Sequence, residues 1–241
     1  MILTCCIYVT VLKKLIALLF VSVSAPAMAH LTWIDAGEQS LGLSTGHNFP
    51  AKEITVKGEY VESITCRAHN GEVFRLTFNE NSIRYVYKER PANCLAILKT
   101  SLIELSPHQG AQHFDENKVD KTLVNKVLKS EKFSEEYFKA AQIKPVEKDG
   151  DLYNADMAQF ITLPGDNSTI YVYKNGQPLV NLPVGLEYPE TPVTLWSKTD
   201  SNGKVSLLLQ PKGKALLRTL ITEEKGNAYK SQFLSVILNG Q

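Results

Sequence analysis

The feature that most constrains the fold is a series of short segments in which apolar and polar residues alternate. Before residue 105, β-branched and aromatic residues recur at every second position in EITVKGEYV, EVFRLTFN, SIRYVYKE and CLAILKTSLIEL. Turn signals separate these segments at Asn70-Gly71 and at Asn79-Glu80-Asn81. The pattern predicts an antiparallel β-sandwich over this part of the chain.

A second run of β pattern begins after Leu163. Strand-like segments are separated by Asn175-Gly176 and by Asp200-Ser201-Asn202-Gly203, and AYKSQFLSVIL follows as a last strand. Roughly six or seven short strands in this space are typical of a small immunoglobulin-like or transthyretin-like sandwich.

Residues 115–143 interrupt the β pattern and contain neither Gly nor Pro. Apolar residues recur there at four-residue spacing: Val119, Leu123 and Val127, then Phe133, Tyr137 and Ala141. This spacing predicts two short amphipathic helices with a break near Ser130. The expected fold is therefore mainly β, with two sandwich domains, the first carrying a short helical insert.

The first 29 residues have the features of a secretory signal. Lys13 and Lys14 precede the apolar run LIALLFVSVSA, and Ala27-Met28-Ala29 forms an A-x-A cleavage site. The apolar run is short for a membrane span, although an uncleaved anchor is the alternative. The expected division is a signal over 1–29, a first domain over 30–163 and a second over 164–241, with no later membrane span.

Composition limits the partners of the exported chain. The sequence has 26 Lys and Arg against 25 Asp and Glu, and removal of Lys13 and Lys14 with the signal leaves a charge near zero. Such a balance gives no support for binding to nucleic acids or to anionic membranes.

Two cysteines, Cys66 and Cys94, follow the predicted cleavage site. An even pair in an exported chain predicts a disulfide, which would contribute about 3–4 kcal/mol by restricting the unfolded chain. The alternative, a pair of metal thiolates, is disfavoured because there is no C-x-x-C spacing and no histidine-rich tract beside them.

Cleavage after Ala29 would make His30 the first residue of the mature chain. Its α-amine and imidazole Nδ1 could then chelate one metal ion, and both groups lose a proton near neutral pH. Nitrogen ligands suit Ni(II), Co(II), Cu(II) and Zn(II). His47 in STGHNFP is the best second ligand, because Gly46 and Pro50 mark a turn that could bring it to the end of the sandwich where His30 lies.

Other side chains have less specific roles. Asp35 and Glu38 are candidate oxygen ligands. Three histidines beside turns or loops are expected to be solvated: His69, His108 and His113. Two tryptophans, Trp33 and Trp196, are expected in the core. The alternative for His30 is an exposed residue that happens to follow the signal.

The sequence lacks the common signatures of enzymes. It has no G-x-S-x-G elbow, phosphate loop, H-E-x-x-H pair or dinucleotide fingerprint. The expectation is a protein that is not an enzyme.

Three regions resemble the NikM-like periplasmic family of unknown function, which is associated with nickel and cobalt uptake transporters. They are AHLTWIDAGE, the segment from CLAILKTSLIEL to SEEYFKAA, and the C-terminal region with GQPL and TDSNG. Family members often have a histidine in the strand where this chain has Ile221 and Thr222. The resemblance implies a periplasmic protein that binds Ni(II) or Co(II) and has a membrane transporter component as its partner.

Two functional hypotheses follow. The first is a periplasmic metal-binding protein that uses His30 and His47 to deliver Ni(II) or Co(II), with Cu(II) or Zn(II) as alternatives, to a membrane uptake system. The second is a β-sandwich adhesion or scaffold module that binds a protein or a glycan through its loops.

Overall fold

The computed structural model describes residues 31–189, 191–206 and 213–239. Within these ranges the chain is mainly β, as predicted, with two α-helices and three sheets. Across the same ranges, no helix combines the length and the apolar character needed to cross a bilayer. The predicted signal and His30 lie outside the described residues.

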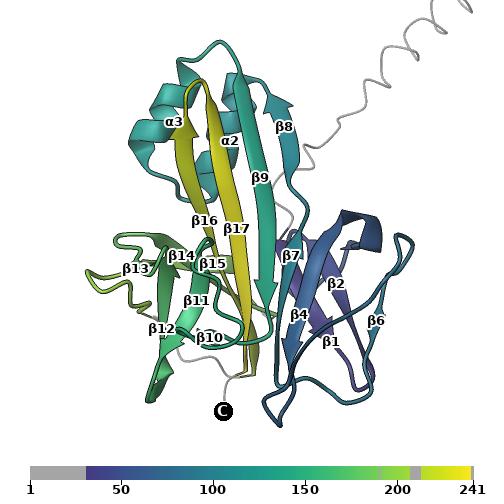
Figure 1. The fold of residues 1–241 in the computed structure, drawn as a ribbon. Helices are drawn as coiled ribbons and strands as arrows, with labels where there is room; N and C mark the ends of the chain where they lie inside the picture. Colours follow the sequence, from purple (N-terminus) through teal and green to yellow (C-terminus); the bar gives the residue numbers. More distant parts are fainter. Residues whose placement is uncertain (1–30, 190, 207–212, 240–241) are drawn as a thin grey trace, which may run out of the picture.

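A central sheet of nine strands forms the middle of the molecule (Figure 1). Its neighbours are antiparallel except for one parallel pair, β17 with β9. In order across the sheet the strands are β15 (Thr191–Lys198), β14 (Pro183–Tyr188), β16 (Lys214–Lys225), β17 (Ala228–Asn239), β9 (Phe133–Gln142), β7 (Asn93–Leu98), β4 (Val61–Arg67) and β5 (Val73–Arg75), and β8 (Ser101–Leu105) also pairs with β9.

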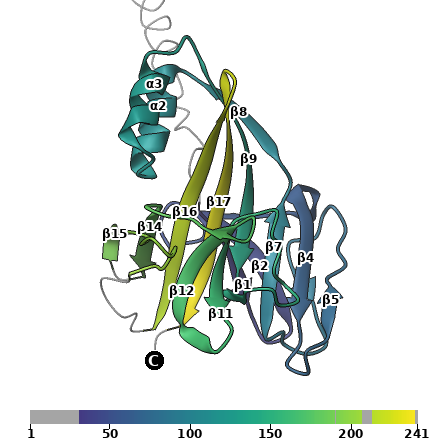
Figure 2. The same cartoon turned by 60° about the vertical axis from the view of Figure 1, so that its left-hand side comes forward.

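Two smaller sheets flank the central sheet. The N-terminal sheet contains β1 (Leu31–Ala36), β2 (Ser40–Gly46), β3 (Ile54–Thr55) and β6 (Tyr85–Val86), and a 3-10 turn η1 (Gly58–Tyr60) follows β3. The second small sheet, here called the β11–β12 sheet, contains β10 (Val146–Glu147), β11 (Gln159–Leu163), β12 (Asp166–Lys174) and β13 (Gln177–Pro178). Figure 2 shows β11 and β12 in front of β16 and β17.

The small sheets cover opposite faces of the central sheet. Phe160 and Val172 of the β11–β12 sheet belong to the same buried cluster as Leu217 and Leu234. Successive residues alternate between the faces, so that Ala140 joins this cluster whereas Ala141 joins the cluster beneath the N-terminal sheet. The central sheet is therefore buried on both faces, which explains the nearly continuous apolar runs ALLRTLI and FLSVIL in β16 and β17.

Sequence reasoning is wrong about residues 133–142. They form strand β9, not the second predicted helix. The four-residue spacing of Phe133, Tyr137 and Ala141 is typical of a helix, but β9 pairs with β17 over eight residues, from Glu135 with Tyr229 to Gln142 with Val236. That pairing joins distant parts of the chain, so a local pattern cannot reveal it.

The two helices pack beside the upper part of the β16–β17 hairpin (Figure 1). They are α2 (Pro107–Glu116) and α3 (Lys121–Leu128), so the helical region begins earlier and ends sooner than predicted. Helix α2 starts with a capping box in which Ser106 and Gln109 each bond the other's backbone N–H. Gly110 allows close contact with the sheet, because a Cβ there would lie 2.3 Å from Phe133 Cγ.

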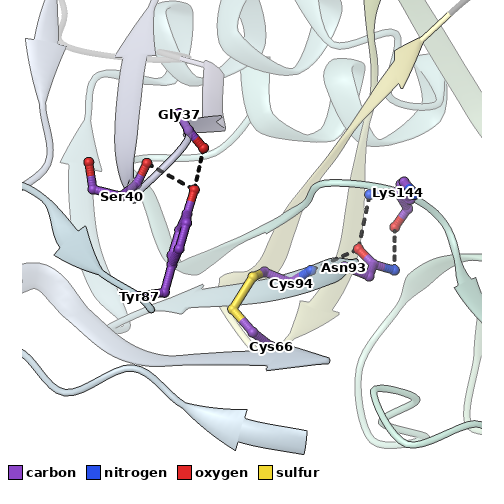
Figure 3. The surroundings of a disulfide bond; sticks show 7 residues. All are labelled: Gly37, Ser40, Cys66, Tyr87, Asn93, Cys94 and Lys144. Atoms are coloured by element: carbon purple, nitrogen blue, oxygen red, sulfur yellow. Dashed lines mark hydrogen bonds between the residues drawn. A yellow bond between two sulfur atoms is a disulfide. The ribbon is translucent and has the colours of Figure 1, made fainter. Parts of the chain in front are cut away.

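The predicted disulfide between Cys66 and Cys94 is confirmed (Figure 3). The two residues are 28 positions apart and face each other directly across β4 and β7, with a Cα–Cα distance of 4.1 Å. Both are fully buried. On one side of the disulfide, Asn93 Oδ1 accepts a hydrogen bond from the backbone N–H of Lys144. On the other side, the Tyr87 hydroxyl donates a hydrogen bond to Gly37 O. The bond thus lies in a closed part of the core.

Strands from both sides of residue 163 share the central sheet. β9 and β7 come from the first predicted domain, and β14 to β17 come from the second. The two sandwiches have this sheet in common, and the division into two domains stays a prediction.

Candidate functional site

His47, the predicted ligand that lies within the described residues, follows the open end of the β1–β2 hairpin, where Leu31 pairs with Gly46. The loop after Gly46 turns back to β3. Its course is fixed by Phe49, which is buried edge-on against Trp33 with 5.5 Å between ring centroids. Gly46 is required at the turn, since a Cβ there would lie 2.3 Å from Ala51 O. Trp33 is 2% exposed, which confirms its predicted place in the core.

This loop holds His47 against Glu53. The imidazole Nδ1 lies 2.9 Å from Glu53 Oε1 and 2.8 Å from Oε2. The backbone N–H of His47 donates to the same carboxylate at 3.1 Å. The side chains are 52% and 39% exposed. A solvent-accessible imidazole is thus oriented by a carboxylate on Nδ1, an arrangement common around metal-ligating histidines.

Asp35 and Glu38, the predicted oxygen ligands, do not join His47. Asp35 pairs in register with Gly42, well away from the open end, and accepts a hydrogen bond from Lys52. Glu38 is exposed in the turn at the opposite end of the β1–β2 hairpin. Among residues 31–189, 191–206 and 213–239, no three His, Cys, Asp or Glu side chains are grouped to hold a metal. His30, the predicted anchor, is not among them.

The other histidines have different environments. His69 is exposed in the turn between β4 and β5, and His108 is exposed on the first turn of α2, as predicted. His113 is only 3% exposed, so its predicted solvation is wrong. The sequence spacing predicts a loop around His113, whereas α2 turns this residue toward the sheet together with Ala111 and Phe114.

The partner of His113 is Glu135 of β9, which sequence reasoning missed. His113 Nε2 lies 3.1 Å from Glu135 Oε2, and the carboxylate side chain is 1% exposed. The imidazole lies among Phe114, Phe133 and Phe233, with ring centroids 5.7 to 6.3 Å away. A capping box before PHQGAQH was the sequence signal that could have placed His113 on a helix.

A second polar cluster, centred on a partly buried arginine, ties the helices to the sheet. Arg218 of β16 donates through Nε to Glu187 Oε1 at 2.7 Å and through Nη1 to Asn117 Oδ1 at 3.0 Å. Its guanidinium also lies 4.7 Å from the centroid of Trp196. Asn117 Nδ2 in turn donates to His113 O at the end of α2. These contacts satisfy Arg218 and Glu187, so we interpret them as structural.

Comparisons of the chain with protein-family models, curated proteins and solved structures find no match. The resemblance to the NikM-like family therefore stays a prediction.

Proposed function

We propose that the chain is an exported metal-binding protein and that it binds a transition metal at the open end of the β1–β2 hairpin. The observation that carries the proposal is the register of this hairpin, in which Leu31 pairs with Gly46. Leu31 directly follows position 30 in the sequence, and Gly46 directly precedes His47. We therefore infer that the α-amine and imidazole of a first residue His30 bind the same metal ion as His47.

Glu53 supports His47 as a ligand. Its carboxylate contacts Nδ1, so we assign the metal to Nε2. A carboxylate on the second ring nitrogen fixes the tautomer and raises the basicity of the ligand. Two imidazoles and an amine form a nitrogen donor set that suits Ni(II) or Co(II), with Cu(II) and Zn(II) as competitors.

Delivery to a membrane uptake system requires that a partner protein can reach the bound metal. The proposed ligand set permits this because it is exposed and leaves coordination positions for another ligand. A site at the edge of a sheet can pass its ion to a transporter component by ligand exchange. Protons compete with metal ions for nitrogen ligands, so the affinity should fall as the pH is lowered.

Calorimetric titration of Ni(II), Co(II), Cu(II) and Zn(II) into protein that begins at His30 tests the proposal. We expect at least a tenfold loss of affinity for protein with one extra residue before His30, and a similar loss for His47→Ala. Glu53→Gln should cause a smaller loss, because it removes only the charge beside Nδ1.

His69→Ala is the matched control, since it removes an exposed turn histidine elsewhere. Equal affinities for the His30-start and extended proteins would contradict the amine ligand. Equal affinities for wild type, His47→Ala and His69→Ala would overturn the site and favour the adhesion or scaffold hypothesis.

A further inference from the structure

Strand β8 lies at the margin of the central sheet. On one side it pairs with β9, from Ser101 opposite Tyr137 to Leu105 opposite Phe133. On its other side no strand pairs with it among the described residues. Figure 1 shows β8 beside β9 in the upper part of the molecule. The backbone N–H and C=O groups on an open edge of this kind can pair with a strand from another chain.

The open place beside β8 lies in line with β4. Strands β7 and β8 follow one another along β9, and β4 pairs with β7 up to Val61 opposite Leu98. The chain before Val61 leaves this row in η1, where Tyr60 O accepts a hydrogen bond from the Lys99 backbone N–H at 2.9 Å. A strand added to β8 would therefore continue the row of β4 beyond Tyr60 and, like β4, would run antiparallel to its neighbour.

A cavity of about 390 Å³ lies between the N-terminal sheet and the central sheet, at the start of β8. Ser101 and Tyr137 line it, and they are direct partners across β8 and β9, so their side chains project from the same face. On an added strand, the residue opposite Ser101 would project from this face as well, toward the cavity. The rest of the apolar lining comes from Ile54, Val56, Tyr60 and Leu98. The cavity is therefore a pocket for one apolar side chain of a bound strand.

Three exposed apolar side chains lie around this edge. Ile54 is 55% exposed, Tyr60 is 57% exposed and Leu102 is 67% exposed. Ile54 and Tyr60 line the cavity, whereas Leu102 projects from the opposite face of β8, because it is the residue after Ser101 in the strand. Both faces of an added strand would therefore cover apolar surface that now contacts water, and this burial favours binding.

The charged side chains that line the cavity are basic. They are Lys57, Lys99 and Lys139, and no Asp or Glu is among the described residues of the lining. Lys139 already contacts the Phe233 ring, and Lys57 lies 3.8 Å from Glu59 in an exposed pair. Lys99 is exposed and forms no ion pair with a described residue. An acidic side chain on the added strand, placed beside Lys99, would therefore meet a complementary charge.

We propose that β8 binds an extended segment of a partner protein as an additional strand. The segment has apolar residues opposite Ser101, Leu102 and Ile103, the first of them in the cavity, and an acidic residue near its C-terminal end, beside Lys99. Backbone hydrogen bonds to β8 supply affinity, and the cavity and Lys99 supply specificity. His47 does not line the cavity, and neither this proposal nor the metal site depends on the other.

Fluorescence anisotropy with labelled heptapeptides tests the proposal. The peptides are Thr-Lys-Val-Val-X-Thr-Asp, with Leu, Val or Phe as X, so that X falls opposite Ser101 and the final Asp falls beside Lys99. We expect saturable binding of at least one peptide to the exported chain, and slower hydrogen exchange of the β8 amides in the complex. Two further peptides are methylated at alternate backbone nitrogens. One of them should bind at least tenfold more weakly, because only one set of N–H groups faces β8.

Ile54→Asp and Lys99→Glu test the two contacts that supply specificity. Both side chains are exposed, so both variants should fold, and each should lower the affinity for the peptide at least fivefold. The matched controls are Val86→Asp, at another exposed β-branched residue, and Lys121→Glu, at an exposed lysine of α3. Both controls should leave the affinity within twofold. High salt should reduce the effect of Lys99→Glu but not that of the methylated backbone, because salt screens exposed charges.

Several outcomes would overturn the proposal. They are the absence of saturable binding for all three peptides, equal affinities for the unmethylated and both methylated peptides, and equal affinities in wild type, Ile54→Asp and Lys99→Glu. Sedimentation velocity tests a second copy of the chain as the occupant. Dimers of wild type that Leu102→Asp abolishes would assign the edge to self-association and overturn the partner segment, whereas a monomer at all concentrations would agree with an open edge.

Discussion

The molecule contains two His–Glu pairs with nearly the same separation and opposite surroundings. In the loop after β2, His47 and Glu53 are 2.8 Å apart, with 52% and 39% of their side chains exposed. Under α2, His113 and Glu135 are 3.1 Å apart, with 3% and 1% exposed. Each pair joins an imidazole to a carboxylate. We therefore attribute the expected difference in their contributions to stability to burial.

Because the inner pair, His113 and Glu135, is buried, disturbing it should lower the free energy of unfolding. His113 Nδ1, His113 Nε2 and Glu135 Oε1 form no hydrogen bond of acceptable geometry with the described residues, so the 3.1 Å approach of Nε2 to Oε2 is the contact that joins the pair, and three phenylalanine rings surround the imidazole. Removing one member would leave the other buried without its partner. The outer pair contacts water, so it contributes little to stability and can bind a ligand.

The largest expected effect is that of His113→Phe. Phenylalanine fits an aromatic environment, but it leaves the Glu135 carboxylate buried beside it. We expect the free energy of unfolding to fall by about 3–5 kcal/mol, measured by urea denaturation with circular dichroism. A loss below about 1 kcal/mol would show that Glu135 finds another partner or water.

Gly110→Ala should have the next largest effect. Alanine normally favours a helix interior over glycine, yet here its Cβ would lie 2.3 Å from Phe133 Cγ. Displacement of α2 should lower the free energy of unfolding by about 1–3 kcal/mol in the same assay. The control is the same substitution in a Phe133→Leu background, where the added cost should be smaller because the ring is absent. An equal cost in both backgrounds would contradict this contact.

The double variant His113→Phe with Glu135→Leu should be much milder than His113→Phe alone. Replacing both buried polar side chains with apolar ones leaves no unpaired group, so stability should lie within about 1 kcal/mol of wild type. Completing the cycle with Glu135→Leu alone gives the coupling energy of the pair. Strictly additive losses would mean that the two side chains do not stabilise each other.

The smallest stability effect is expected at the outer pair. His47→Ala should change the free energy of unfolding by less than about 1 kcal/mol, and high salt should reduce the difference further because exposed charges are screened. Unfolding in low and high salt measures this. A loss as large as that of His113→Phe would contradict the contrast between the two pairs.

Local sequence signals were reliable where the structure depends on local geometry. The turns at Asn175-Gly176 and Asp200–Gly203 are present, and Asn175, Gly176 and Gly203 have positive φ. Asp200 Oδ1 accepts backbone hydrogen bonds from Asn202 and Lys204, as expected for this turn chemistry. The disulfide also followed from the number of cysteines and the predicted export, and β4–β7 pairing brings the two residues together.

The candidate sites were less predictable. The turn around His47 makes it a predicted ligand, and no local pattern indicates that Glu53 contacts it. The four-residue spacing in β9 predicts a helix and so gives no indication that Glu135 contacts α2, and a loop predicted around His113 places that side chain in solvent. The cavity between the sheets could not be inferred either, since its lining comes from segments spread from Thr32 to Lys139.

The order of the amino acids is enough to predict the strand-rich composition, the turns, the amphipathic segment that becomes α3 and the cysteine pair. Each depends on interactions between residues that are close along the chain or on simple counting. Three other features are visible only in the folded chain: β9 is a strand, one sheet serves both sandwiches, and one histidine is buried while another is exposed. Those outcomes depend on pairing between distant segments, such as β9 with β17, whose energy exceeds the local preference of either segment.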